Sequence, residues 1–373
     1  MQTARDGPTA QTDLDRIDDE CAAAVLAQAA ASGDVAVAAR VLARFPSSDV
    51  VYKKCGYAIW VAARNGHADI VNLLLRDGRL TPRNLRTCCT HALSVAAGGG
   101  HADVVELLLG AGLEAGDLRF NNAEALRFAV LRGHADVARL LLAAGLTARD
   151  LLYTATRFGY TDIVQLLFEH GYTLDDLRAN GSEVVSVAAC HGHLAMMRLF
   201  FGLGVTLDSV RAHNSRTLKL VAQNGHDDML RLLFAKGIRA DDMRADDNEA
   251  LRLAAWNGRD SVVELLFEQG LTCEDARACD NEALRRAAKA GHARTVELLL
   301  ASGLTSDDAR ACDNEAVVCA AVFGHHSIVR QLLGLGLTFD DVNARNGTAL
   351  KSAHFFEDVE FFDLLKEYNL QHS

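Results

Sequence analysis

The sequence of 373 residues is poor in proline, in aromatic side chains and in long apolar stretches. Only three prolines occur, so helices along the chain are almost uninterrupted. No apolar run approaches the roughly 18 residues of a membrane-spanning helix, so we expect no membrane contact. Aromatic residues make up 6% of the chain and hydrophobic residues 50%. This balance predicts a core built from alanine, leucine and valine.

The markers of enzymes, metal sites and secretion are also missing. There is no Gly-rich phosphate loop, GxSxG, HExxH or kinase motif, so we expect no enzyme activity, no catalytic residue, no cofactor and no small-molecule substrate. Nine cysteines without a CxxC pair predict free thiols and no metal site. The N-terminus has no basic stretch followed by an apolar one, so we expect a cytoplasmic protein. The net charge of −11 argues against nucleic-acid binding.

A short segment recurs along the chain at a nearly fixed interval. It reads GHADVVELLL at residues 100–109, and its glycines are separated by 33, 34, 33, 26, 33, 33, 33, 33 and 33 residues. A period of this size predicts a solenoid of stacked repeats. The glycines are Gly33, Gly66, Gly100, Gly133, Gly159, Gly192, Gly225, Gly258, Gly291 and Gly324.

Each repeat predicts two helices. In the repeat at residues 280–303, Asp280 or Asn281 is expected to cap the first helix. Gly291 is expected to end it, because glycine adopts the left-handed conformation without steric cost. Val296 and Leu299 then form the apolar face of a second helix.

The links between repeats carry a further signal. Thr305 and Asp308 have the spacing of a capping box, which predicts a short helical turn in each link. The same pair recurs as Thr147 and Asp150, Thr173 and Asp176, Thr272 and Asp275, and Thr338 and Asp341.

The motifs AAxxGH and VVxLLL at this period resemble the ankyrin repeat, from about Glu20 to Leu370. The family's TPLH opening is replaced by EALR, as at 249–252 and 282–285, and its β-hairpin by the capped turn. The resemblance implies an all-α solenoid of about 11 helix-turn-helix repeats with short helical-turn links. Such divergent repeats are similar to those of large DNA viruses and amoeba-associated genomes; a viral origin would imply the host cytoplasm or nucleus.

The array is expected to span residues 20–370, after a disordered lead-in at 1–19. Capping repeats are expected at about 20–50 and 348–370. The link at 146–153 is shortened, because 14 residues separate Gly145 from Gly159 where 21 separate Gly237 from Gly258. It predicts a notch in the stack.

Two residue types recur with the period. Seven histidines follow the repeat glycines, and we interpret them as structural hydrogen-bonding groups because no zinc-like ligand set accompanies them. The links carry an arginine ladder, which predicts either a salt-bridge network or, as an alternative, a groove for an acidic peptide or nucleic acid. Its members are Arg86, Arg119, Arg178, Arg211, Arg244, Arg277 and Arg310.

The two free positions in AAxxG vary while their frame stays fixed. The resemblance implies that they line a concave groove that binds an unidentified protein partner, which would make the chain a non-enzymatic, monomeric scaffold. The alternative is a substrate adaptor of a ubiquitin ligase. The aromatic members could instead pack between repeats. The candidate groove residues are Arg64, Arg132, Arg157, Phe158, His191, Trp256, Lys289 and Phe323.

Overall fold

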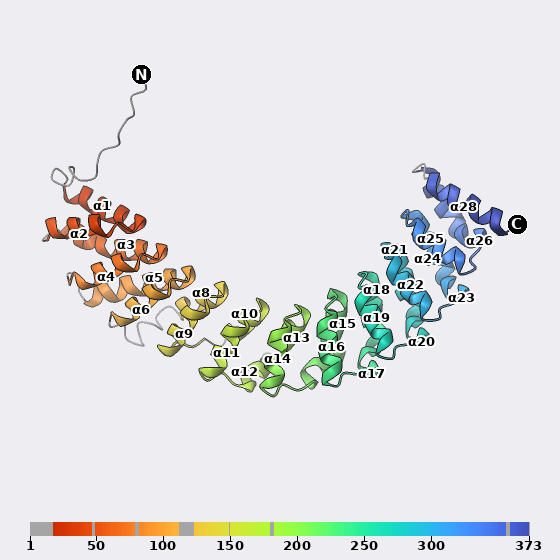
Figure 1. Cartoon of the computed structure of the whole chain (residues 1–373), viewed down its shortest axis with the longest axis horizontal. Helices are drawn as coiled ribbons and strands as arrows, with labels where there is room; N and C mark the ends of the chain where they lie inside the picture. Colours follow the sequence, from red (N-terminus) through yellow and green to blue (C-terminus); the bar gives the residue numbers. More distant parts are fainter. Residues whose placement is uncertain are drawn as a thin grey trace, which may run out of the picture. The chain divides into compact units, whose positions relative to one another are not determined.

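The computed structural model describes residues 18–46, 49–78, 82–111, 123–148, 150–179, 183–355 and 359–372. In these ranges the chain is built from helices and contains no strand (Figure 1). The predicted all-α repeat solenoid is therefore confirmed. The expected lead-in lies outside the described residues, apart from Asp18 and Asp19. The chain divides into two compact units, residues 1–176 and 177–373.

Unit 1 consists of two rows of helices, and successive helices within a row pack against one another. The first-helix row is α1 (Asp19–Ser32), α3 (Asp49–Asn65), α5 (Pro82–Gly99), α8 (Glu124–Arg132) and α10 (Leu151–Arg157). The second-helix row is α2 (Val35–Arg44), α4 (Ala68–Arg76), α6 (Ala102–Gly110), α9 (Ala135–Ala143) and α11 (Thr161–Glu169). The link helix α12 (Leu174–Ala179) follows.

Unit 2 repeats this plan with a short helix in most links. Its first-helix row is α13 (Glu183–Cys190), α15 (Asp208–Asn224), α18 (Ala245–Trp256), α21 (Ala278–Ala290), α24 (Ala311–Val322) and α27 (Ala344–Phe355). Its second-helix row is α14 (Leu194–Gly202), α16 (Asp227–Lys236), α19 (Asp260–Glu268), α22 (Ala293–Ala301), α25 (His326–Gly334) and α28 (Val359–His372). The link helices are α17 (Ala240–Met243), α20 (Cys273–Ala276), α23 (Ser306–Ala309) and α26 (Phe339–Val342).

Small residues allow the first-row helices to pack closely. Ala287 and Ala288 of α21 are fully buried, as are Val296 and Leu299 of α22. Burying each of the larger aliphatic side chains contributes about 1.5–3 kcal/mol. The helices of each unit are therefore held together by an aliphatic core, as the composition predicts.

The capping boxes form at four of the five predicted pairs, whereas Asp150 makes no capping bond and pairs with Arg127. Thr305 donates its backbone N–H to the Asp308 carboxylate at 2.8 Å, and the same bond joins Thr272 to Asp275 at 2.8 Å. Each box opens a link helix of four residues in unit 2, here α23 and α20. The threonine–aspartate pair thus sets where these links turn.

The predicted N-cap at Asp280 or Asn281 is wrong. Cys279, Asp280 and Asn281 all adopt positive φ, between 53° and 58°, and form a left-handed turn ahead of the regular part of α21. Neighbouring repeats have the same turn at Asp246–Asn248 and Cys312–Asn314. Such a turn costs about 1–2 kcal/mol per non-glycine residue. Arg285 offsets part of this cost, because its guanidinium donates to the carbonyls of Asp280 at 2.9 Å and Cys279 at 3.0 Å.

The shortened link leads into the shortest first-row helix, the seven-residue α10, which begins directly after Asp150. Asp150 forms an ion pair with Arg127 of α8. The Tyr172 hydroxyl holds the link by donating to the Ala148 carbonyl. Because α10 packs on α8 and α11 packs on α9, stacking continues through this link within unit 1.

Candidate functional site

Six of the seven histidines that follow a repeat glycine each join two neighbouring repeats. In each of them the Nε2–H donates to a carbonyl near the C-terminal end of the preceding first-row helix, as the predicted structural role requires. The acceptors are Ala31 for His67 (3.1 Å), Arg64 for His101 (3.1 Å), Gly98 for His134 (3.2 Å), Cys190 for His226 (2.9 Å), Trp256 for His292 (2.9 Å) and Lys289 for His325 (3.2 Å).

The imidazole also lies on the glycine of the preceding repeat. A Cβ atom on Gly66 would come within 2.6 Å of His101, and one on Gly291 within 2.6 Å of His325. We call this paired contact of hydrogen bond and ring on glycine the His–Gly clasp. Where histidine is replaced, Arg259 keeps the clasp, since its Nε donates to the Gln223 carbonyl at 3.0 Å and its side chain covers Gly225.

The clasp fixes the backbone at three of the predicted groove positions, Arg64, Trp256 and Lys289, and leaves the side chains of these residues outside. Phe158, Trp256 and Phe323 are 49%, 50% and 55% exposed. About half of each aromatic side chain therefore remains open to solvent. The alternative prediction, that these side chains pack between repeats, accounts for only the buried half. The polar candidates Arg64, Arg132, Arg157, His191 and Lys289 are also exposed.

Three of the eight candidate residues come together in unit 2. Trp256 of α18, Lys289 of α21 and Phe323 at the end of α24 line an open hollow of about 400 Å³, which we call the Trp256 hollow. Its other lining residues are Glu282, Arg285, Arg286, Ala290 and Glu315. The remaining candidates do not reach it.

Ion pairs along the first-row helices shape this hollow. Glu282 pairs with Arg252 of the preceding repeat and with Arg286 of its own helix. Glu315 in turn pairs with Arg285. The Arg286 guanidinium, besides its ion pair, lies over the Trp256 ring at 4.3 Å from the ring centroid, a cation–π contact.

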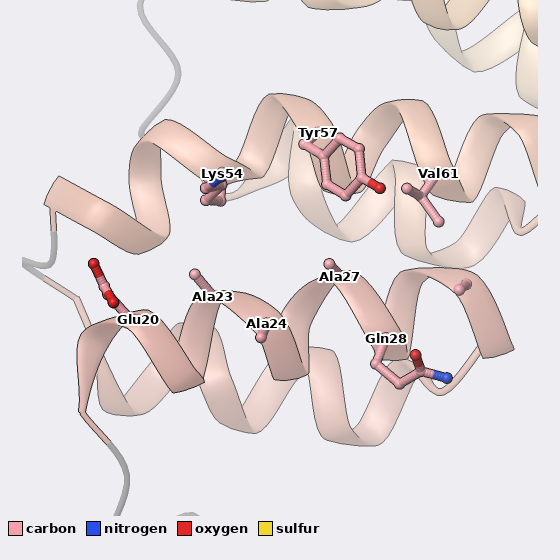
Figure 2. A pocket seen from close by; sticks show the side chains of 9 residues that line it. Glu20, Ala23, Ala24, Ala27, Gln28, Lys54, Tyr57 and Val61 are labelled. Atoms are coloured by element: carbon pink, nitrogen blue, oxygen red, sulfur yellow. The ribbon is translucent and has the colours of Figure 1, made fainter.

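In unit 1 the candidate residues are joined by aromatic residues that the sequence reasoning missed. Arg64 lies over the ring of Trp60, 5.5 Å from its centroid, and Trp60 stacks on Tyr57 at 5.9 Å. Tyr57 is 54% exposed and lines a second hollow of about 610 Å³ between α1 and α3. Figure 2 shows Tyr57 and Val61 on one helix facing Ala23 and Ala27 on the other. The signal in the sequence that could have indicated Tyr57 and Trp60 is the presence of two aromatic residues at helical spacing.

The described arginines of the ladder are engaged by carboxylates of the following link. Each of these four guanidiniums donates through two nitrogens to one carboxylate 31 residues further along, which confirms the salt-bridge interpretation. The pairs, with Nε–O distances, are Arg211–Asp242 (2.7 Å), Arg244–Asp275 (2.8 Å), Arg277–Asp308 (2.8 Å) and Arg310–Asp341 (3.1 Å). The ladder positions Arg86, Arg119 and Arg178 lie outside the described side chains.

These hydrogen bonds lower the pKa of the aspartates that accept them. The pKa of Asp308 is lowered to about 2, chiefly because Arg277 donates to its carboxylate, and the Thr305 backbone N–H acts in the same direction. Arg211 likewise lowers the pKa of Asp242. These carboxylates are shared between an arginine of one repeat and the capping box of the next, so they serve as structural anchors.

Within the described residues, no group of three or more His, Cys, Asp or Glu side chains is placed to hold a metal ion. All nine cysteines are free, and burial raises the pKa of the Cys89 thiol to about 12. In the same ranges, no helix combines the length and the apolar character that crossing a bilayer requires.

The comparison with family models agrees with the repeat architecture. The family model for ankyrin repeats (3 copies) matches residues 26–117, 59–150, 93–178 and 185–277, which together cover more than half of the chain. A solved structure, the human ASB11 ankyrin repeat domain, is similar at 23% identity with a TM-score of 0.45, over 57% of this chain and 97% of that one. No curated protein matches the sequence.

Proposed function

Because the chain belongs to the ankyrin-repeat family, whose repeats are protein-interaction modules, we propose that it is a non-enzymatic scaffold. It binds a protein partner through the C-terminal ends of its first-row helices. The Trp256 hollow is the principal contact surface. The partner meets side chains that are already in place, so little conformational entropy is lost on binding.

One observation carries this proposal: the half-exposed aromatic side chain of Trp256 stands on a backbone that is fixed from the next repeat. Trp256 is held by His292 through its carbonyl and by Arg286 across its ring, yet half of its surface is open. Burying one aromatic side chain removes about 150–250 Å² of surface from water, so leaving it exposed has no stability benefit. Rigid, exposed aromatics of this kind are typical of interface hot spots.

Affinity purification from the native cell tests the proposal. The double variant Trp256→Ala plus Phe323→Ala is expected to lose the captured protein, because each truncation of a hot-spot aromatic costs about 2 kcal/mol or more. Quantitative mass spectrometry of the captured proteins measures the loss.

Val359→Ala is the matched control, because this residue is 68% exposed but lies on α28 of the second-helix row. Capture should be unchanged in the control. Equal capture by the double variant with an intact circular dichroism spectrum would remove the Trp256 hollow from the proposal. Recovery of ubiquitin-ligase subunits would assign the adaptor role.

A further inference from the structure

We propose that the Trp256 hollow recognises an acidic peptide segment in which a carboxylate stands beside a large apolar side chain. This inference rests on the proposed function and gives the chemistry of the partner. The carboxylate is bound by Lys289, and the apolar side chain lies between Trp256 and Phe323.

The charges of the hollow are unequal. Three cationic side chains line it, and Arg252 and Arg345 join them through their contacts with the two lining carboxylates. Five cations therefore surround Glu282 and Glu315. Each of these carboxylates already has two arginine partners, because Arg345 lies 3.7 Å from Glu315 in addition to its pair with Arg285. They have little remaining capacity to bind a basic segment.

Lys289 is the cation left for a partner. Among the described side chains, no carboxylate lies within ion-pair distance of its ammonium. It is exposed one turn beyond Arg285 on α21, on the surface that separates Trp256 from Phe323. An incoming carboxylate would complete its coordination with a charge-assisted hydrogen bond.

The aromatic walls define the second half of the ligand. One face of Trp256 is covered by Arg286, and the Phe323 ring stacks on His325 with a centroid distance of 6.3 Å. Their remaining exposed surfaces are apolar and are fixed by these contacts. An aliphatic or aromatic side chain next to the carboxylate would be buried against both rings.

The helix dipoles act against this assignment, since these residues lie at helix C-termini. Such an effect is worth about 0.3–1 kcal/mol at an exposed site. It is reduced here because the Trp256 and Lys289 carbonyls already accept the ring N–H groups of His292 and His325. The excess of side-chain cations therefore determines the sign of the local potential.

Selection from a phage-displayed library of random short peptides on the full chain tests the inference. Enriched peptides are expected to carry Asp or Glu beside Leu, Phe or Trp. The best peptide and a copy with Asn or Gln for its acids are then compared by fluorescence anisotropy. The neutral copy should bind at least about tenfold more weakly, and Trp256→Ala should weaken the acidic peptide by a similar factor.

Charge reversal provides the second measurement. Lys289→Glu should abolish the preference for the acidic peptide, whereas Lys54→Glu, an exposed lysine of unit 1, should preserve it. Trp256-dependent binding without acid preference would overturn this inference and leave the proposed function intact. Peptide binding that neither Trp256→Ala nor Lys289→Glu changes would contradict both the acidic-peptide inference and the proposed function. Competition by single-stranded DNA, or a dimer of the chain that Trp256→Ala dissociates, would also overturn the acidic-peptide assignment.

Discussion

At the scale of single residues, the repeat glycines have two separate requirements. Gly291 needs a left-handed backbone, with φ of 84°, and it also leaves room for the ring of His325. Gly324 has φ of 73°, but nothing lies within 4 Å of the position where a Cβ would stand. The two positions therefore separate backbone strain from contact with the neighbouring repeat.

Gly324→Ala is expected to destabilise the chain by about 1–2 kcal/mol, the cost of a left-handed non-glycine residue. Gly291→Ala should cost about 1 kcal/mol more, because the added methyl group displaces His325 from its hydrogen bond. Urea unfolding followed by circular dichroism measures both values. Equal losses for the two variants would show that the His–Gly clasp contributes nothing at this site.

The sequence allowed the structural role of these histidines to be predicted, because a periodic residue without ligand partners favours a hydrogen bond. It did not identify the acceptor, since pairing with the preceding repeat depends on how the helices stack. The exposure of Trp256 was equally hidden, because a helical aromatic can face a neighbour or solvent. Arg286 was missed since its contact with Trp256 crosses between two repeats.

At the scale of elements, the links are joined by arginine–aspartate pairs that also complete the capping boxes. Asp308 accepts from Arg277 and from the Thr305 backbone N–H, so its carboxylate holds two consecutive links. Protonation of this one group weakens both bonds. A low pKa in the folded state therefore makes the links sensitive to acid.

The direction in which stability changes with pH follows from the pKa of Asp308, which is about 2 in the folded chain and about 4 in an unfolded one. The folded state binds fewer protons, so this stabilisation is complete above about pH 4 and is lost as the pH falls towards 2. Asp308→Asn should therefore reduce the loss of thermal stability between pH 4 and pH 2. Differential scanning calorimetry measures the midpoint at each pH.

Asp307→Asn is the control, because this neighbouring carboxylate is 92% exposed and its pair with Arg310 contributes little. Its acid profile should match that of the unmodified chain. An unchanged profile in Asp308→Asn would assign the acid sensitivity to other groups.

The left-handed turns before the first-row helices were not predicted from the sequence. Asp280 and Asn281 are favoured both as N-caps and in left-handed conformations, so local preference does not separate the two. Arg285 decides between them by binding the carbonyls of the turn. In the next repeat Val318 stands at the corresponding position, and Arg345 of the following repeat donates to Cys312 and Asp313 instead.

At the scale of the whole molecule, the period and the glycines are sufficient to predict the architecture. The described residues contain eleven first-row helices and eleven second-row helices, in agreement with about 11 repeats. The division into two units after residue 176 is not marked by any change in the repeat period of the sequence. The only interruption of the period, from Gly133 to Gly159, lies inside unit 1.

Nucleic-acid binding is expected to be absent. The net charge is −11, and the four described ladder arginines are engaged by carboxylates, so few cations are free to neutralise phosphates. Fluorescence anisotropy with labelled double-stranded DNA at low salt should show no change. Binding that weakens steeply as salt increases would instead support the basic-groove alternative.

The His–Gly clasp has a consequence for how such a chain can lengthen. Where the clasp forms, a repeat supplies a histidine to the repeat before it and a glycine to the repeat after it, so these junctions are chemically alike. A duplicated repeat would therefore fit between its parent and the next one without any compensating substitution. Because the clasp uses only the backbone carbonyl of the neighbouring exposed positions, the side chains there could diverge in each new copy towards a different ligand.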